Sequence, residues 1–147
     1  MPSITMVPHL IVTNGPEAIA FYKKAFGAVE AHPANLAPDG QKVVHAELRL
    51  GEATFYLCDD FTPEQNRNPQ ALGGSPVTLN LTVEDADAVF ARAVEAGAIV
   101  SMPMEDTFWG ARYGKLKDPF GHEWSINQQV REVSPEELKQ ASDAYFS

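Results

Sequence analysis

The sequence predicts an α+β fold made of two successive βαβββ modules followed by a short C-terminal helix. Short runs with an apolar residue at every second position alternate with two amphipathic helical segments. Gly27 and Gly97 each end a helical pattern, and Gly51 and Gly121 each lie in a predicted hairpin turn. Both pairs are 70 positions apart, so the order of elements repeats once along the chain.

The first module begins with a strand at about residues 7–13 and a helix directly after it. Asn14 is a good N-cap, Pro16 is tolerated in the first helical turn, and Glu17 is placed to complete a capping box. Apolar residues then recur at helical spacing until Gly27. Further strands are predicted at about residues 28–32, 43–50 and 53–58, with a loop through position 40.

A polar connection at residues 59–74 separates the two modules. It contains Pro, Asn, Gln and paired Gly with little apolar content, so we expect a mobile segment. The second module starts at about position 76, and Asp85 caps its helix. Strands are predicted at about residues 78–83, 99–101, 110–116 and 121–127, with a Pro-containing loop at 102–106.

The chain closes with a predicted helix at about residues 134–145. Ser134 is its N-cap, Pro135 occupies the first turn, and Leu138 and Tyr145 lie on one apolar stripe. We expect this helix to pack on the domain or on a partner subunit. We interpret the chain, 1–147, as one domain with module 1 at about 5–60, a linker at about 61–74 and module 2 at about 75–128.

Composition limits the classes of partner. The net charge of −9 argues against nucleic acid and anionic membranes, because neither is attracted to an acidic surface. The single Cys58 excludes an intrachain disulfide, fits a reducing compartment and lies in an apolar run typical of a buried inert thiol. No stretch is long enough to span a bilayer and no leader pattern is present. We therefore expect a cytoplasmic protein.

Several predicted strands carry polar residues at every second position. His45, Glu47 and Arg49 share one strand face, which is either a cavity wall or a salt-bridged surface exposed to solvent. The short polar residues at 78, 80 and 82, and those at 123, 125 and 127, form similar faces in the second module. Polar faces on central strands favour a wall that hydrogen-bonds a ligand or ordered water.

Four segments resemble one known superfamily. They are residues 18–27, residues 45–51, residues 74–76 together with 83–88, and residues 108–126, which contain Asp-Pro-Phe-Gly-His at 118–122. Two βαβββ modules with these segments resemble the glyoxalase/bleomycin-resistance, or vicinal oxygen chelate, superfamily, and more closely its PhnB-like branch. The resemblance covers about residues 7–128 and is specific for the fold, whereas the reaction varies within the superfamily.

The resemblance implies curled mixed sheets that enclose a ligand cavity on their concave side. In metal-dependent members, four inward side chains bind one divalent cation, one from the first and one from the last strand of each module. The matching positions here are Thr78, Ser125, Phe55 or Tyr56, and Val7 or His9. Hydroxyl, aromatic and aliphatic side chains cannot replace imidazole and carboxylate ligands. We therefore expect the usual metal set to be absent; a divalent metal, if bound, would use His9, His45 and Glu123.

Three functions follow from these patterns. The first is a metal-free protein that binds and sequesters a small molecule. The second is a metal-dependent lyase, isomerase or dioxygenase that uses the histidine and glutamate set. The third is a metal-free enzyme with Glu123 as general base and Arg112 as support for an oxyanion.

The predicted ligand-binding side chains come from both modules. His9 either contacts a ligand or forms hydrogen bonds within its sheet. Trp109 is either a platform for a ligand or a core residue. Arg112 either binds an anion or pairs with Glu105 or Asp106. The full predicted ligand-binding set is His9, His45, Thr78, Asn80, Trp109, Arg112 and Ser125, with Glu123 as the candidate catalytic residue. The resemblance also implies a homodimer, and the linker is long enough to permit exchange of modules.

Overall fold

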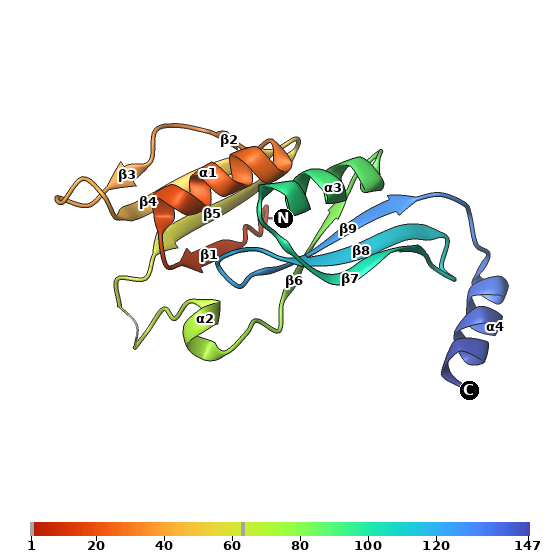
Figure 1. The fold of residues 1–147 in the computed structure, drawn as a ribbon. Helices are drawn as coiled ribbons and strands as arrows, with labels where there is room; N and C mark the ends of the chain where they lie inside the picture. The colour runs from red at the N-terminus through yellow and green to blue at the C-terminus, as the bar shows by residue number, and fades with distance from the viewer. Residues whose placement is uncertain (1, 63) are drawn as a thin grey trace.

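Two βαβββ modules account for most of the structure, a computed structural model that describes residues 2–62 and 64–147 (Figure 1). The first module contains β1 (His9–Val12), α1 (Gly15–Phe26), β2 (Val29–Glu30), β3 (Asn35–Leu36), β4 (Val43–Leu50) and β5 (Ala53–Asp59). The second contains β6 (Thr78–Thr82), α3 (Ala86–Ala96), β7 (Ile99–Asp106), β8 (Ala111–Lys117) and β9 (Glu123–Gln129). Helix α2 (Pro69–Leu72) lies between the modules, and α4 (Pro135–Phe146) ends the chain.

Each module forms its own sheet with the same topology. The strand order is β1-β5-β4-β2 in the first, with β3 also pairing with β4, and β6-β9-β8-β7 in the second. In both, the first strand pairs in parallel with the last, and the other pairs are antiparallel. The predicted α+β fold with a repeated βαβββ order is confirmed, and the two sheets remain separate and open.

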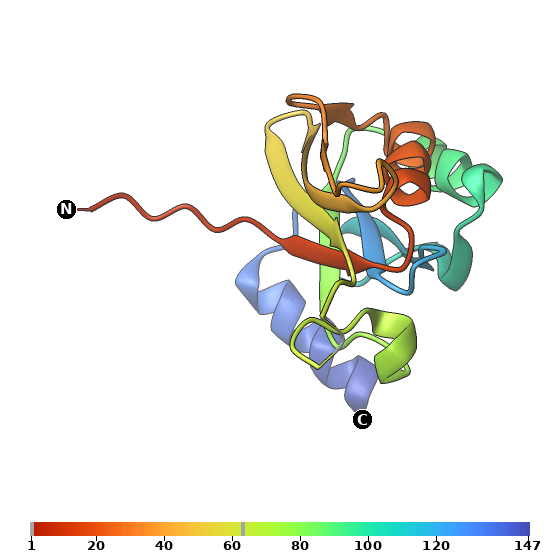
Figure 2. The same ribbon diagram turned by 90° about the vertical axis from the view of Figure 1, so that its left-hand side faces the viewer.

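Helices α1 and α3 lie side by side and cover one face of the two sheets (Figures 1 and 2). The side chains of Asn14 and Asp85 accept hydrogen bonds from the first turns of α1 and α3, as predicted for these caps. Arg92 of α3 donates from Nε to the carbonyl oxygen of Lys24 at 2.8 Å. This contact satisfies the C-terminal end of α1 and ties the two helices together.

The last strand of each module holds the start of its helix. Buried Asp59 accepts hydrogen bonds from the backbone amides of Gly15 at 2.9 Å and Val43 at 2.7 Å. A Cβ atom at position 15 would lie 2.5 Å from the Asp59 carboxylate, so this approach requires glycine. In the second module, Gln128 Oε1 accepts from the amide of Ala86 at 3.0 Å.

An aromatic core joins the two modules around the buried carboxylate of Asp118. Tyr22 Oη and Trp124 Nε1 donate to Asp118 Oδ2 at 2.5 and 2.8 Å, and the amides of Phe120 and His122 donate to Oδ1. Burial, followed by the neighbouring Asp118 charge, raises the pKa of Tyr22 well above its usual value. The Tyr22 hydroxyl therefore stays protonated and remains a donor.

Three segments differ from the sequence prediction, and one of them is β3, which lies in the predicted loop through position 40. In the connection expected to be mobile, β5 extends through Asp59, and buried Asn68 caps α2 through its side chain. Gln70 Nε2 also donates to the carbonyl oxygen of Pro119 at 3.0 Å, so α2 packs on the second module. Position 63 of the predicted linker lies outside the described residues. The predicted loop at 102–106 belongs to β7, an edge strand in which the missing amide of Pro103 is tolerated.

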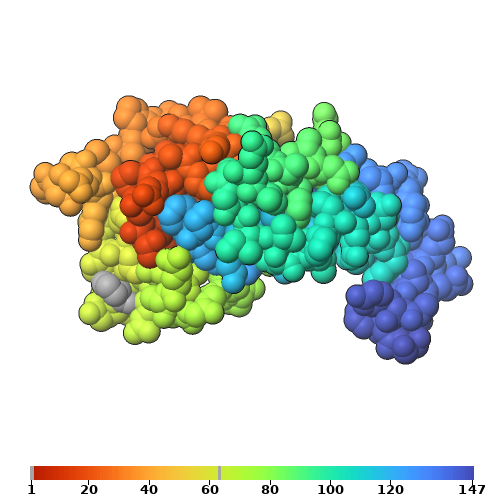
Figure 3. Space-filling model, viewed as in Figure 1, coloured from red at the N-terminus to blue at the C-terminus, as the bar shows by residue number. Residues whose placement is uncertain are grey.

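Helix α4 stands apart from the two modules (Figure 3). None of its residues is buried, and the Tyr145 ring approaches Phe108 with a centroid distance of 5.3 Å. The sequence predicted that this helix packs on the domain or on a partner subunit. The contact between Tyr145 and Phe108 lies within the same chain. Among the described residues, no helix is long and apolar enough to cross a membrane.

The Asp118 network gives a stability prediction. Tyr22→Phe should lower the free energy of unfolding by about 1.5–3 kcal/mol, because it deletes a buried hydrogen bond to a charged group. Tyr145→Phe is the matched control on an exposed ring and should change stability by less than about 0.5 kcal/mol. Urea unfolding of both variants measures the difference, and equal stabilities would show that the Tyr22 hydroxyl is not an anchor.

Candidate functional site

Polar side chains gather on the sheet faces that the two helices leave uncovered. Along the strands of the first sheet, Leu10, Leu48 and Leu57 are buried beneath the helices. Their neighbours in sequence point to the opposite face because side chains alternate along a strand. That face carries His9 on β1, His45 and Glu47 on β4, and Tyr56 and Cys58 on β5.

Three rings form a cluster on this face of the first sheet. His9 lies opposite Tyr56 in the β1–β5 register, with ring centroids 6.1 Å apart. The His45 ring lies 4.8 Å from Tyr56 and 6.1 Å from His9, and all three pairs meet edge to face. His32 stacks at 6.4 Å from His45. The structure thus groups the predicted His9 and His45 and adds the rings of Tyr56 and His32.

Partial burial and a neighbouring imidazole lower the pKa of one member of this cluster, His9. Desolvation, followed by the charge of His45, lowers the pKa of His9 below its usual value. At neutral pH, His9 therefore offers one nitrogen donor and one acceptor. Burial and the nearby Asp59 and Asp60 raise the pKa of the Cys58 thiol, so Cys58 stays protonated and unreactive.

The corresponding face of the second sheet carries a row of short polar side chains. Thr78, Asn80 and Thr82 on β6 lie opposite Glu123, Ser125 and Asn127 on β9. Ser125 is buried and donates from Oγ to Asn80 Oδ1 at 2.8 Å, while Asn80 Nδ2 donates to Thr82 Oγ1 at 3.2 Å. Thr78, Asn80 and Thr82 are exposed and retain free hydrogen-bonding capacity toward solvent.

The two polar faces adjoin at the edges formed by β1 and β6. A small cavity of about 280 Å³ lies at this junction and is lined by His9, Leu79 and His122, among others. The His122 Nε2 atom lies 2.8 Å from the carbonyl oxygen of Ile11, which links the turn before β9 to β1. Of the ring cluster, His9 lines this cavity, and β6 contributes Leu79, which lies between Thr78 and Asn80 in the sequence.

Glu123 is held by neighbours of its own module. Its carboxylate lies 3.9 Å from Lys117 Nζ and accepts a hydrogen bond from Ser101 Oγ at 3.3 Å. Within residues 2–62 and 64–147, no three His, Cys, Asp or Glu side chains are grouped as ligands for a metal ion. His9 and His45 approach each other, whereas Glu123 does not complete a set with them. The described side chains do not fit a bound divalent cation, and we derive no step through one.

Arg112 and Trp109 lie at different places from the ring cluster. Arg112 points to the helix side, where it pairs with Asp87 of α3 at 3.2 Å and with Asp106 at 3.5 Å. The pair with Asp106 is one of the alternatives predicted for Arg112, whereas the pair with Asp87 was not predicted. We leave this residue out of the proposed site. Trp109 is 41% exposed at the β7–β8 turn and meets Tyr113, which shares the polar face with Asn127.

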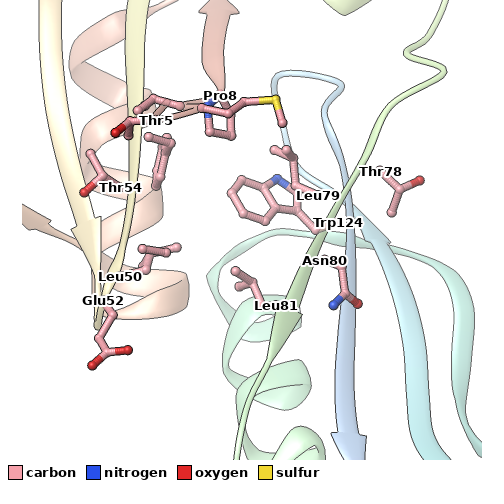
Figure 4. A pocket seen from close by; sticks show the side chains of 14 residues that line it. Thr5, Pro8, Leu50, Glu52, Thr54, Thr78, Leu79, Asn80, Leu81 and Trp124 are labelled. Atoms are coloured by element: carbon pink, nitrogen blue, oxygen red, sulfur yellow. The ribbon is translucent and has the colours of Figure 1, made fainter. Parts of the chain in front are cut away.

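A larger opening between the modules was not predicted from the sequence. This inter-module cleft, of about 490 Å³, is bounded by the β4–β5 hairpin, residues 5–8 and β6. Leu79, Leu81 and Trp124 project toward it (Figure 4). The predicted residues Thr78 and Asn80 also line the cleft, with their side chains turned away from these apolar groups. The alternation of apolar residues along β6 predicts that one face of this strand is buried. It does not predict how far β6 lies from the first module, because that distance depends on packing between distant segments.

The lowered pKa of His9 gives a pH prediction. In the unfolded chain, His9 has its higher usual pKa near 6.5. As the pH falls, the unfolded chain therefore binds a proton at His9 more readily than the folded chain does. Stability should therefore fall between about pH 7.5 and about pH 5, and this fall should be smaller in His9→Asn. His32→Asn, on an exposed histidine, is the control for urea unfolding at both pH values. An equal fall in wild type and His9→Asn would contradict the assignment.

Known proteins are similar to this chain in sequence and in architecture. An uncharacterized protein of Mycobacterium bovis (Mb0911c) is 49% identical over 138 residues, which span 91% of this chain and 89% of that protein. An uncharacterized Arabidopsis thaliana protein (At5g48480) is 33% identical over 126 residues, 82% of this chain and 75% of that protein. The crystal structure of that gene product superposes with a TM-score of 0.69 and covers 85% of this chain and 98% of its own.

More distant structures share the fold. A PhnB protein from Bacillus cereus, 19% identical, superposes with a TM-score of 0.67 and covers 85% of this chain and 99% of its own. The family model of the Glyoxalase/Bleomycin resistance protein/Dioxygenase superfamily matches residues 4–126, which include both modules. The chain therefore belongs to the Glyoxalase/Bleomycin resistance protein/Dioxygenase superfamily.

Proposed function

We propose that the chain binds and sequesters a small molecule on the polar faces of its two sheets. The observation that carries this proposal is the cluster of His9, His45 and Tyr56, whose rings lie 4.8–6.1 Å apart on a face that no helix covers. Side chains that combine aromatic surface with nitrogen and hydroxyl groups are typical of small-molecule sites.

The second sheet would supply the complementary contacts. Asn80 is fixed by hydrogen bonds with Ser125 and Thr82, and an amide held in this way is pre-oriented toward a ligand. Thr78 and Asn80 are exposed, and Leu79 between them lines the junction cavity that His9 also borders. A compact ligand that reaches both faces would contact imidazole and phenol groups on one side and hydroxyl and amide groups on the other.

The side chains favour a flat, polar ligand. The edge-to-face rings leave aromatic surface for a planar group, and neutral His9 offers both a donor and an acceptor. Of the basic groups near this region, Lys117 is placed beside Glu123, which offsets its charge toward an anion. A ring that bears hydroxyl, carbonyl or amide groups matches these contacts.

Binding is favoured over catalysis by the state of the reactive groups. Glu123 lies beside Lys117 and accepts from Ser101, and these contacts engage the oxygens that a general base would use. Cys58 is buried and protonated, so it is no nucleophile. The enzyme hypothesis with Glu123 as general base remains the alternative, whereas His9, His45 and Glu123 are not grouped as metal ligands among the described residues.

The remaining proposals on partners and location rest on composition. The net charge of −9 disfavours nucleic acid and anionic membranes, and the only cysteine is a free buried thiol, which fits a reducing cytoplasm.

A thermal-shift screen of small cyclic compounds with hydroxyl, carbonyl or acid groups tests the binding proposal. A ligand at 100 times its Kd should add about 2.7 kcal/mol to the free energy of unfolding. For a hit, His45→Ala and Asn80→Ala should each raise Kd at least about tenfold, since each removes a direct contact. Arg112→Ala is the control on the helix side and should leave Kd unchanged. A hit that is insensitive to His45 and Asn80 would contradict the proposed site.

Glu123→Gln separates binding from catalysis. We expect the variant to retain ligand affinity within about threefold, because Glu123 already pairs with Lys117 in its own module. Incubation of wild type with the hit, followed by mass spectrometry of the ligand, should return the compound unchanged. Conversion by wild type that is lost in Glu123→Gln would replace the sequestration proposal with the general-base alternative.

A further inference from the structure

A connected group of aromatic rings lies at one end of the second sheet, where the β7–β8 turn meets α4 (Figure 1). In this aromatic group each ring lies 4.9–5.6 Å from the next, in the order Tyr113, Trp109, Phe108, Tyr145 and Phe146. All five rings are at least partly exposed to solvent. Contiguous aromatic surface left in water marks an interaction site.

Lys115 lies beside the aromatic group on the uncovered face of the second sheet. Tyr113 and Lys115 are two positions apart on β8, so both side chains point to the same side. The residues next to Lys115 point to the helix side. Leu116 is buried in the core, and a Cβ atom at Gly114 would lie 2.8 Å from the Phe90 ring of α3.

Lys115 also differs from the other two cations of β8 in having no acidic partner. Arg112 and Lys117 both pair with carboxylates, whereas within the described part of the chain the Lys115 ammonium forms no ion pair or hydrogen bond. Glu105 lies opposite Tyr113 on β7, but it does not pair with Lys115. Lys115 is half-buried, and a partly desolvated cation gains from an anion that forms charge-assisted hydrogen bonds with it.

We propose that this face of the second sheet binds a small aromatic carboxylate, with the carboxylate on Lys115 and the ring on the Tyr113–Trp109 pair. The two rings of the pair meet edge to face at 5.6 Å, an arrangement that leaves ring faces open for stacking. Residues two positions apart on a strand are about 7 Å apart. An acid whose ring and carboxylate are joined by a short aliphatic chain therefore reaches both groups.

This site is separate from the ring cluster of the first sheet. It uses none of the side chains of His9, His45 and Tyr56, so it does not depend on the function proposed above. The net charge of −9 does not prevent binding of an anion here, because charges more than about 8 Å away are largely screened at physiological ionic strength. The unpaired ammonium is the nearest charge to the bound carboxylate.

Tryptophan fluorescence tests the site, because the two tryptophans of the chain have opposite environments. Trp109 is 41% exposed, whereas Trp124 is buried in the core. Titration of the full chain with 3-phenylpropanoate should change the emission in a saturable manner, and Trp109→Phe should abolish this signal. The neutral 3-phenylpropanamide should bind at least about tenfold more weakly, because it lacks the charge that Lys115 recognises. No saturable change, or equal affinities for acid and amide, would overturn the proposal.

Substitutions of Lys115 test its role directly. Lys115→Met should raise the Kd of 3-phenylpropanoate at least about tenfold, whereas Lys115→Arg, which keeps the charge, should stay within about threefold. Lys24→Met removes the same charge from the exposed side of α1 and should leave Kd unchanged. Circular dichroism checks the folding of each variant, and the comparison of acid with amide on wild type decides the proposal even where Lys115→Met does not fold. An unchanged Kd in folded Lys115→Met would contradict the proposal.

His45→Ala distinguishes this site from the ring cluster. The variant should bind 3-phenylpropanoate with the Kd of wild type, because His45 belongs to the first sheet. Binding that is lost in His45→Ala and retained in Lys115→Met would place the acid on the ring cluster. That result would overturn this inference and leave the function proposed above standing.

Discussion

The buried carboxylate of Asp118 is the contact on which the arrangement of the two modules depends. It lies in the turn before β9 and accepts from Tyr22 on α1, Trp124 on β9 and two amides of its own turn. A buried charge is tolerated because four donors satisfy its two oxygens. One carboxylate thereby fixes the helix of the first module against the closing hairpin of the second.

The position of the two helices follows from this anchor and determines where a ligand can bind. With α1 and α3 side by side on one face and joined by Arg92, the apolar side of each sheet is covered. The opposite side keeps the alternating polar residues, and the junction cavity between β1 and β6 is lined by His9 of the ring cluster and Leu79 of β6. The core thus positions the polar faces without containing a functional residue itself.

Local patterns predicted most of the fold, because caps, helix-ending glycines and strand alternation act within a few residues. The same alternation predicted that His9 and His45 point to the same side of the sheet. In the structure, their rings lie close together on that side. Tyr56 as a partner ring, α2 in the connection and the full length of β7 were missed, because each depends on contacts with distant segments. Arg112 could not be placed from sequence, since its choice between Asp87, Asp106 and a ligand is decided by where α3 packs.

The central claim is that a ligand binds the His9, His45 and Tyr56 face. Histidine-selective NMR of the wild-type chain, titrated with a hit compound and assigned with His→Asn variants, tests it most directly. The account predicts that the His9 and His45 ring signals shift in a saturable manner while His122, which is bound to the Ile11 carbonyl oxygen, shifts less. Saturable binding that leaves the His9 and His45 signals unchanged would contradict it.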